Sequence, residues 1–266
     1  YERIMSVLPM DDDIETERVG VNGTPAEWIS APESQENRVI LYLHGGGYLF
    51  GSARTHRVML AHMARASKAR VLALDYRLAP EIPFPAPVED SVSAYRWLLD
   101  QGISAKKMVI GGDSAGGGLA IAALVALRSV GEPMPAAGVC ISAWTDMEST
   151  GQSHTTNAES DPSVSKERLL KIAKVYLAGK DPTAPLASPI HADLTGLPPL
   201  LLQVGSIEVL LDDSTLLKSR AKAAGVSVEM EVWDDMPHVW HHYAPILPEA
   251  RKAIGRIGEF VLEHTG

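Results

Sequence analysis

The chain has 266 residues, of which 45% are hydrophobic and 21% charged, which suits one large globular domain or one domain with an inserted cap. Its 24 basic and 33 acidic residues give a net charge of −9, which disfavours nucleic acids and anionic membranes as partners. The sequence has no run of 18 apolar residues and no basic start followed by an apolar block, so we expect neither a membrane span nor a signal peptide.

Residues 14–31 predict an antiparallel pair of strands, after which short apolar strands alternate with amphipathic helices. The predicted strands cover 38–44, 70–76, 107–112, 136–142, 199–205 and 226–233. The predicted helices cover 56–68, 87–102, 115–131, 212–224 and 247–263. This alternation indicates an α/β fold with a mostly parallel central sheet and helices on both faces.

The strand at 136–142 carries the only cysteine of the chain, Cys140. A single cysteine excludes a disulfide within the chain and is typical of a reducing compartment, so we expect a cytoplasmic protein. Because Cys140 lies in the apolar run AGVCIS, we expect a buried structural thiol rather than a catalytic one.

Residues 145–192 interrupt the alternation between two sheet strands. They contain the helical pattern SKERLLKIAKVYLAG and several Pro and Asp turn signals, and the insertion is too long for a bare loop. We expect this segment to form a helical cap over the carboxyl ends of the strands, joined by residues 1–20 as an N-terminal cap segment. The catalytic domain is then expected to comprise 21–144 and 193–266.

The segment VIGGDSAGGG places Ser114 between a predicted strand and a predicted helix. Residues 112–116 match G-x-S-x-G, the pattern of a nucleophile elbow, in which a serine occupies a sharp strand-to-helix turn. The glycines give this turn steric clearance, and the helix N-terminus favours developing negative charge. A phosphate-binding loop is the alternative, but no lysine follows in the Walker arrangement.

Three consecutive glycines follow His44 at the end of an earlier predicted strand. Such a loop lets backbone N–H groups turn toward a ligand, and acyl transfer needs such donors at the developing oxyanion. We assign the N–H groups of Gly46, Gly47 and Ala115 to an oxyanion hole. The alternative is a plain flexible loop, and His44 is expected to order the loop rather than to act as a base.

A serine hydroxyl needs a neighbouring base to become a nucleophile. His238 follows the strand at 226–233, at the carboxyl end where the site should lie, and we expect it to be this base. His238, His241 and His242 also have the i, i+3, i+4 spacing of a metal site on a helix. No cysteine or acidic partner with metal-site spacing accompanies them, so we predict no metal.

A serine–histidine pair of this kind is completed by an acidic residue, which forms a catalytic triad with them. We expect this acid to follow the strand PLLLQVG, in the segment SIEVLLDD. We expect Glu208, three residues past that strand, to orient His238 and stabilise its imidazolium form. Asp212 is the second candidate, although an acidic residue at the start of a helix more often caps it.

Four aromatic residues lie near the turns that are expected to form the site. They are candidates for lining an acyl or alcohol pocket, and each could equally be part of the core. These residues are Tyr48, Phe50, Trp144 and Trp240.

Together these motifs resemble the hormone-sensitive-lipase-like (bacterial family IV) carboxylesterases of the α/β-hydrolase superfamily. The resemblance runs from about residue 36 to the end and rests on HGGGY, DYRLAPEIPFPAPVED, GDSAGG, DPSVS, SPIHADLTGLPPLLLQVGS and DMPHVW. It implies a capped α/β-hydrolase that acts on carboxylic esters, usually with short acyl chains, and needs no cofactor. The family usually carries Asp at the position of Glu208 and a longer N-terminal cap segment than residues 1–20 provide.

The sequence therefore predicts a serine carboxylesterase that hydrolyses small-molecule, short-chain esters through an acyl-enzyme on Ser114. An amidase or acyltransferase with the same triad is one alternative, and a non-catalytic small-molecule receptor on the same fold is another. The presence of His238 argues against the receptor. The segment VSVEMEVW, residues 226–233, could be an edge strand, which makes a homodimer through strand pairing a further hypothesis.

Overall fold

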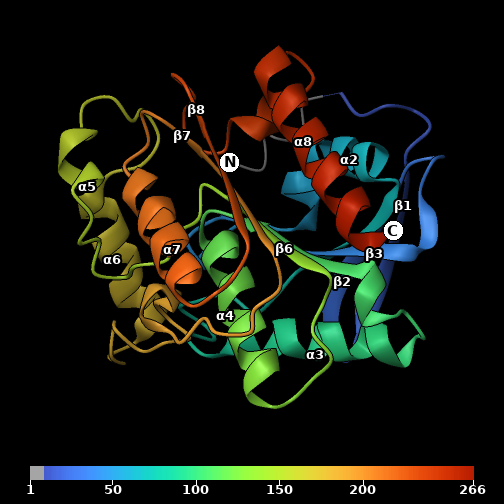
Figure 1. Ribbon diagram of the computed structural model, residues 1–266, viewed down its shortest axis with the longest axis horizontal. Coiled ribbons are helices and arrows are strands. Elements are labelled where there is room, and N and C mark those ends of the chain that lie inside the picture. Colours follow the sequence, from blue (N-terminus) through green and yellow to red (C-terminus); the bar gives the residue numbers. More distant parts are fainter. Residues whose placement is uncertain (1–8) are drawn as a thin grey trace.

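The computed structural model describes residues 9–266, which form one eight-stranded sheet (Figure 1). In sheet order the strands are β1 (Glu15–Val21), β2 (Thr24–Ser30), β4 (Ala69–Leu74), β3 (Gln35–Leu43), β5 (Met108–Asp113), β6 (Ala137–Ile141), β7 (Leu200–Gly205) and β8 (Val228–Trp233). Strand β2 is antiparallel to both of its neighbours, and every pairing from β4 to β8 is parallel. The predicted mostly parallel sheet is confirmed.

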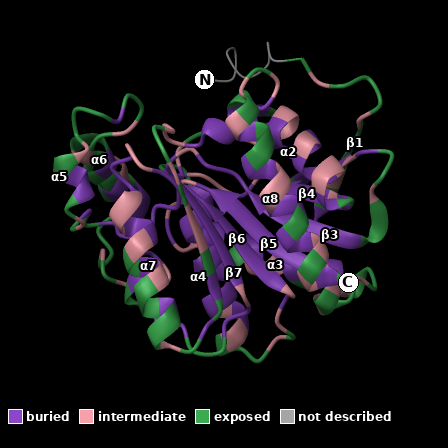
Figure 2. Ribbon diagram, turned by 45° about the horizontal axis from the view of Figure 1, so that its top comes forward, coloured by how far each residue is buried: buried purple, intermediate pink, exposed green. Residues whose placement is uncertain are grey.

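Strand β3 shows why apolar residues follow one another without alternation in this sheet. Val39, Leu41 and Leu43 lie in one core, whereas Ile40 and Tyr42 lie in the other, because successive side chains leave opposite faces of a strand. Helices α2 (Ala53–Ser67) and α8 (Pro248–Thr265) cover one face, and α3 (Ala86–Asp100), α4 (Ala115–Ser129) and α7 (Leu211–Ala223) cover the other (Figure 1). The central strands are buried between these helix layers (Figure 2).

Helix α2 begins three residues before the predicted start because the chain supplies a cap there. The Ser52 hydroxyl accepts from the Thr55 backbone N–H at 3.3 Å, and the Thr55 hydroxyl accepts from the Ser52 N–H at 3.0 Å. This reciprocal pair satisfies two N–H groups that a helix start otherwise leaves without partners. The helix ends at Lys68, which adopts the left-handed conformation.

Between β6 and β7 the chain leaves the sheet for residues 142–199, which include α5 (Ser153–Thr156), α6 (Lys166–Leu177) and the short helix η2 (Pro189–His191). Helix α6 is the one predicted from SKERLLKIAKVYLAG, and the Ser165 hydroxyl caps it by accepting from the Arg168 backbone N–H. Helices α5 and α6 lie beside α7 at the end of the molecule remote from β1 (Figure 1). Across residues 9–266, no helix combines the length and apolar character needed to cross a bilayer.

The predicted N-terminal cap segment, residues 1–20, requires a correction. Residues 15–20 belong to β1, which pairs along its whole length with β2, from Glu15 opposite Ser30 to Val21 opposite Thr24. Val21 is buried in the core beneath the sheet, so this segment is held by backbone pairing and apolar contact. Residues 1–8 of the predicted segment lie outside the described residues.

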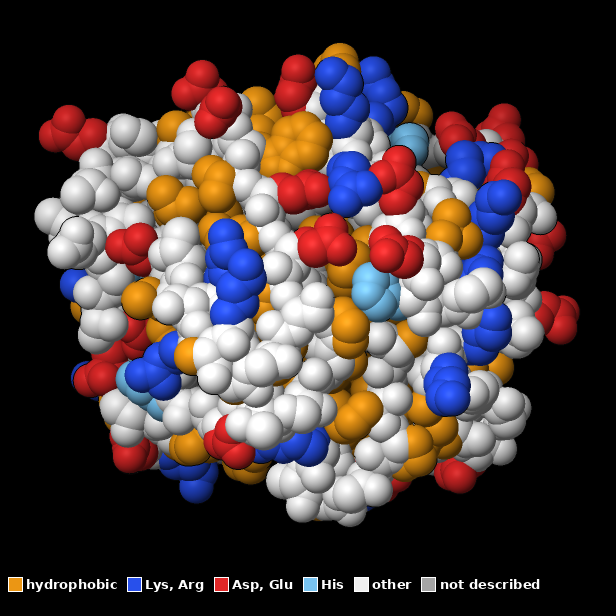
Figure 3. Space-filling model, in the orientation of Figure 1, with side chains coloured by type: hydrophobic (Ala, Val, Ile, Leu, Met, Phe, Trp, Pro, Cys, Tyr) orange, Lys and Arg blue, Asp and Glu red, His pale blue; other side chains and the backbone are white. Residues whose placement is uncertain are grey.

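Acidic and basic side chains are interspersed over the face of the molecule that Figure 3 shows. Arg65, for example, pairs with Asp13 at 2.7 Å and with Glu33 at 3.0 Å. Exposed pairs of this kind contribute about 1 kcal/mol or less each, whereas fully burying one large aliphatic side chain contributes roughly 1.5–3 kcal/mol. The two apolar cores therefore dominate the stability of the fold.

Candidate active site

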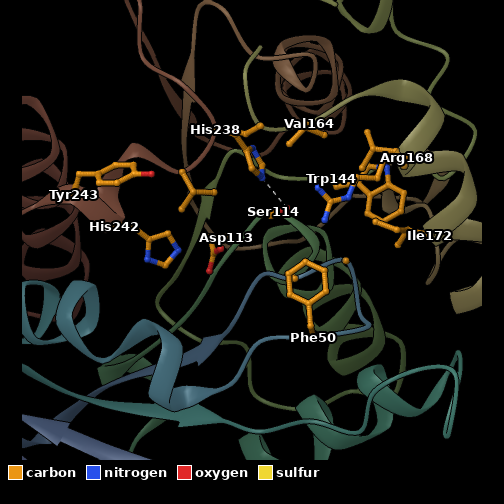
Figure 4. Close-up of a pocket in the computed structure, with 15 residues that line it drawn as sticks. Phe50, Asp113, Ser114, Trp144, Val164, Arg168, Ile172, His238, His242 and Tyr243 are labelled. Carbon is orange, nitrogen blue, oxygen red and sulfur yellow. Dashed lines mark hydrogen bonds between the residues drawn. The ribbon is translucent and has the colours of Figure 1, made fainter. Parts of the chain in front are cut away.

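A pocket with a volume of about 460 Å³ lies at the carboxyl ends of the parallel strands (Figure 4). This is where ligands collect in α/β sheets, because the strand-to-helix loops meet there. Four parts of the chain supply its walls: the loop after β3, the turn after β5, the β6–β7 connection and the segment after β8. The lining residues are Gly46, Gly47, Phe50, Asp113, Ser114, Trp144, Ser163, Val164, Arg168, Leu169, Ile172, His238, Val239, His242 and Tyr243.

Ser114 occupies the turn between β5 and α4 in a strained backbone conformation, with φ of +54°. The residues two positions before and after Ser114 must be glycine. A Cβ on Gly116 would overlap the Leu43 carbonyl, and a Cβ on Gly112 would overlap the carbonyl of Gly116. The Ser114 backbone is fixed on both sides, by its N–H to the Ile141 carbonyl at 2.8 Å and by its carbonyl to the Trp144 N–H at 2.9 Å. The predicted steric reason for the glycines is therefore correct.

The hydroxyl, the imidazole and the carboxylate expected from three distant segments meet at this turn. His238 Nε2 lies 2.9 Å from Ser114 Oγ (Figure 4). His238 Nδ1 lies 2.8 Å from Glu208 Oε2. An ionised carboxylate can only accept a hydrogen bond, so Nδ1 carries the proton and Nε2 is free to accept one from the serine.

The carboxylate of Glu208 is fully buried, and each of its oxygens has a partner. While Oε2 faces His238, Oε1 accepts from Ser142 Oγ at 2.7 Å and from the Gly205 N–H at 2.6 Å. The second candidate acid, Asp212, instead accepts from the Ser153 N–H at 2.9 Å at the start of α7. The structure thus brings Glu208, and not Asp212, to the imidazole.

The charge of Glu208 sets the proton affinity of His238, whose side chain is 12% exposed. Burial of the ring by itself lowers its pKa. The hydrogen bond and charge of Glu208, together with the charges of Asp161 and Asp113, outweigh burial and raise the pKa of His238 above its ordinary value of 6.5. Because the ring gains proton affinity in this way, it is a stronger base toward the serine hydroxyl.

The glycine loop presents backbone N–H groups to the same pocket. Gly46 and Gly47 adopt φ of +121° and +62°, conformations that residues with a side chain rarely adopt. Within residues 9–266, the N–H groups of Gly46, Gly47 and Ala115 have no protein acceptor. Ala115 is the first residue of α4, where a helix leaves its N–H groups without internal partners.

Buried side chains hold this loop in place from below. Asp113 Oδ1 accepts from the Gly45 N–H at 3.0 Å and from the Tyr42 hydroxyl at 2.9 Å. The Tyr76 hydroxyl donates to the His44 carbonyl at 2.6 Å, and its ring stacks on the His44 ring at 4.3 Å. Burial lowers the pKa of His44 to about 4, so this ring stays neutral and orders the loop.

Two of the four aromatic candidates line the pocket. Phe50 is 38% exposed at its edge, and Trp144 is fully buried behind it. The other two are core residues, which is the alternative that the sequence left open for them. Tyr48 stacks on Tyr176 at 3.8 Å, and Trp240 packs in the core beneath α8.

Several lining residues were not identified from the sequence, and most come from the β6–β7 connection. Their sequence pattern is that of an ordinary amphipathic helix and a turn. They form part of a site only because the folded chain brings them close to the other segments that line the pocket. They are Ser163, Val164, Arg168, Leu169, Ile172 and Tyr243.

Two sets of residues in the described chain bring potential metal-ligand atoms within 4.8 Å of one another. Asp146, Glu148 and His191 form one set, and His56, Asp113 and His242 form the buried one. The three histidines considered from their spacing as an alternative metal site, His238, His241 and His242, do not form one set, because His241 Nε2 faces Gln203 Oε1 at 2.8 Å. In the buried set His56 already lies 3.1 Å from Asp113, which supports the glycine loop, so we assign no ion there.

Cys140 lies away from this chemistry. Its side chain is buried, with Sγ 3.6 Å from the Gly117 carbonyl. Burial raises the pKa of the thiol to about 12, so it stays protonated and unreactive. The predicted structural role of Cys140 is in agreement with this placement.

Comparison with known proteins places the fold and the chemistry in one family. Residues 40–242 match the family described as alpha/beta hydrolase fold. An acetyl-hydrolase of Streptomyces hygroscopicus is 52% identical over 248 residues, which cover 93% of this chain and 83% of that protein.

Solved structures agree with this assignment. A crystal structure of an esterase from the bacterial hormone-sensitive lipase family superimposes with a TM-score of 0.99 at 67% identity, over 100% of this chain and 90% of that one. The esterase EstE5, in crystals soaked with p-nitrophenyl butyrate, superimposes with a TM-score of 0.96 at 53% identity, over 99% and 90% of the two chains. The chain belongs to the hormone-sensitive-lipase-like, family IV carboxylesterases of the α/β-hydrolase superfamily.

Proposed function

We propose that Ser114, His238 and Glu208 are the catalytic triad of a serine carboxylesterase that works through an acyl-enzyme. The observation that carries this proposal is the unbroken chain of hydrogen bonds from the Ser114 hydroxyl through His238 to Glu208. In acylation, Ser114 Oγ attacks the ester carbonyl while His238 Nε2 takes its proton. Glu208 holds the ring in the required tautomer and stabilises the imidazolium that forms.

The N–H groups of Gly46, Gly47 and Ala115 receive the oxyanion of the tetrahedral intermediate. Such preorganised donors lower the barrier because they need no reorientation as the negative charge develops. His238 then returns its proton to the leaving alcohol. In deacylation the ring takes a proton from water, which attacks the acyl-enzyme, and Ser114 leaves with that proton.

Short acyl chains fit this site best. Residues 145–192 act as a cap over it, and their side chains Val164, Leu169 and Ile172 meet Trp144 in the pocket wall. A volume of about 460 Å³ accommodates a small ester but not a long-chain triglyceride. The crystal of the related EstE5 soaked with p-nitrophenyl butyrate supports the use of this ester as the test substrate.

The proposal is tested by Ser114→Ala, assayed on p-nitrophenyl butyrate beside the wild-type chain. Loss of the nucleophile is expected to lower kcat on the order of 10⁶-fold. Matched amide and alcohol-acceptor substrates, measured in parallel, distinguish ester hydrolysis from amide hydrolysis and acyl transfer. Full retention of turnover by the alanine variant would show that the serine is not the nucleophile.

Strand β8 supports a homodimer formed by strand pairing. It ends the sheet formed by residues 9–266, so within that part of the chain no strand pairs with its outer edge, and its Val232 side chain is 46% exposed. We expect light scattering to give the mass of a dimer for the wild-type chain and of a monomer for Val232→Lys. A monomeric wild-type chain at tens of micromolar would refute the pairing.

A further inference from the structure

The segment DPSVS, residues 161–165, begins with a buried carboxylate, and two of its later residues line the pocket. Asp161 is 8% exposed, although no arginine or lysine pairs with it among the described residues. Burying a carboxylate is costly unless hydrogen bonds replace its hydration. Its partners therefore indicate what the residue is for.

The two oxygens of Asp161 bind two different parts of the site. Oδ1 accepts from the backbone N–H groups of Ser163 at 2.9 Å and of Val164 at 3.0 Å, both of which line the pocket. Oδ2 accepts from the Val209 N–H at 2.9 Å, 48 residues further along the chain. Val209 directly follows Glu208, so one carboxylate joins the pocket wall to the loop that carries the acid.

Asn157 holds the same loop from the other side of Glu208. Its side-chain amide donates to the Glu208 carbonyl at 2.9 Å and to the Ser206 carbonyl at 3.1 Å. The Asn157 carbonyl in turn accepts from the Asp161 N–H at 2.9 Å. Asn157 and Asp161 thus fix the backbone both before and after the acid.

We infer that Asp161 is a positioning residue, which holds Glu208 within reach of His238 and at the same time fixes the pocket wall at Val164. This inference rests on the proposed function, because it assigns Asp161 a role only if the triad operates. A chain with glutamate as its acid depends more on such positioning than a chain with aspartate. Glutamate has one more rotatable bond, so its carboxylate depends more on where the backbone is held.

Asp161 also acts on His238 through its charge. The charged and titratable groups that face the ring come from four elements: Glu208 after β7, Asp161 before α6, Asp113 at the end of β5, and His242 in η3 (Trp240–Tyr243). The three carboxylates raise the pKa of His238. Removing the charge of Asp161 should therefore lower it.

A second Asp-Pro turn in the same insertion shows that a local turn does not require this arrangement. In Asp181-Pro182-Thr183, Asp181 Oδ1 accepts from the Thr183 N–H at 2.8 Å, as Asp161 does from Ser163. Asp181 is exposed, however, and within the described residues its carboxylate accepts hydrogen bonds from the N–H and the hydroxyl of Thr183 alone. Asp181→Asn is consequently a matched control, which weakens a turn but not the acid loop.

The test compares Asp161→Asn with Asp181→Asn on p-nitrophenyl butyrate across pH, together with the thermal unfolding temperature of each. We expect Asp161→Asn to lower kcat about tenfold or more, since small displacements of catalytic groups are costly. Its acid limb of kcat/KM should also move to lower pH. Asp181→Asn should match the wild-type chain in both respects. Asp161→Glu, which keeps the charge but displaces the loop, should lose kcat with an acid limb close to that of the wild type.

If Asp161→Asn loses stability but keeps the wild-type kcat and acid limb, Asp161 only holds the fold and the inference is wrong. If Asp161→Asn does not fold, Asp161→Glu and Asn157→Ala decide, because an unchanged kcat in both would equally overturn it. Failure of the proposed function gives a different result, namely a wild-type chain whose turnover does not depend on Ser114.

Discussion

At the scale of single residues, Glu208 is the group whose chemistry can be tested most finely. Glu208→Gln keeps the shape but places an amide against His238 Nδ1, which favours the wrong tautomer, so we expect kcat to fall on the order of 10⁴-fold. Glu208→Asp keeps the charge and should lose less. Asp212→Asn, which weakens only the contact to Ser153 and the first turn of α7, is the control and should stay close to the wild-type rate.

The pH dependence of kcat/KM follows from the state of His238. The ring must be neutral to accept the serine proton, so activity is lost as the pH falls through its pKa. Because that pKa is raised, the acid limb of the wild-type profile should lie above 6.5. Glu208→Gln removes the main cause of the increase and should move the limb to lower pH. An unchanged limb in that variant would contradict the assignment of the pair.

At the scale of elements, replacing either of two glycines in helix α8 by alanine should change the stability of the chain in opposite directions. A Cβ at Gly255 meets nothing within 4 Å, so Gly255→Ala should stabilise the chain by roughly 0.5–1 kcal/mol through helix propensity alone. A Cβ at Gly258 would lie 2.5 Å from the Ala66 carbonyl oxygen of α2. Gly258→Ala must therefore separate α2 from α8 and should destabilise the chain. Urea unfolding of both variants measures the difference, and equal effects would contradict the packing of α2 on α8.

The elements were predictable to the extent that their signals are local. Apolar strands, amphipathic helices and the glycines around Ser114 each follow from neighbouring residues, and the order of the strands and helices along the chain predicted the sheet. The acid loop illustrates the limit: Glu208 was identified from its place after a strand, but the contact of Asp161 with Val209 spans 48 residues and leaves no local pattern. The sequence left Tyr48 and Trp240 open between pocket and core for the same reason, since packing decides which way a ring turns.

At the scale of the whole molecule, buried neutral histidines make the fold sensitive to acid. Burial lowers the pKa of His44 to about 4 and of His241 and His242 to about 3. In the unfolded chain these histidines have a pKa of about 6.5, so below this pH they bind protons that the buried rings of the folded chain do not bind. Stability therefore falls as the pH falls from 6.5 toward the lower pKa values of the folded state. By about pH 5 each group removes on the order of 2 kcal/mol.

This loss is measured as the free energy of unfolding in urea between pH 4 and pH 7. His241→Gln removes one titrating ring, and its stability should depend less steeply on pH than that of the wild-type chain. The slope is the readout, whatever the variant loses at neutral pH. An equal slope in both proteins would show that His241 is not the source.

The most direct measurement of the central claim is the site of covalent attack by an ester-like phosphorylating reagent. The chain is treated with a p-nitrophenyl dialkyl phosphate, digested and analysed by mass spectrometry. We predict one adduct, on Ser114, whose formation abolishes turnover and is slowed by orders of magnitude in His238→Ala. Complete inactivation with Ser114 unmodified, or an adduct that forms equally fast without the imidazole, would contradict the account.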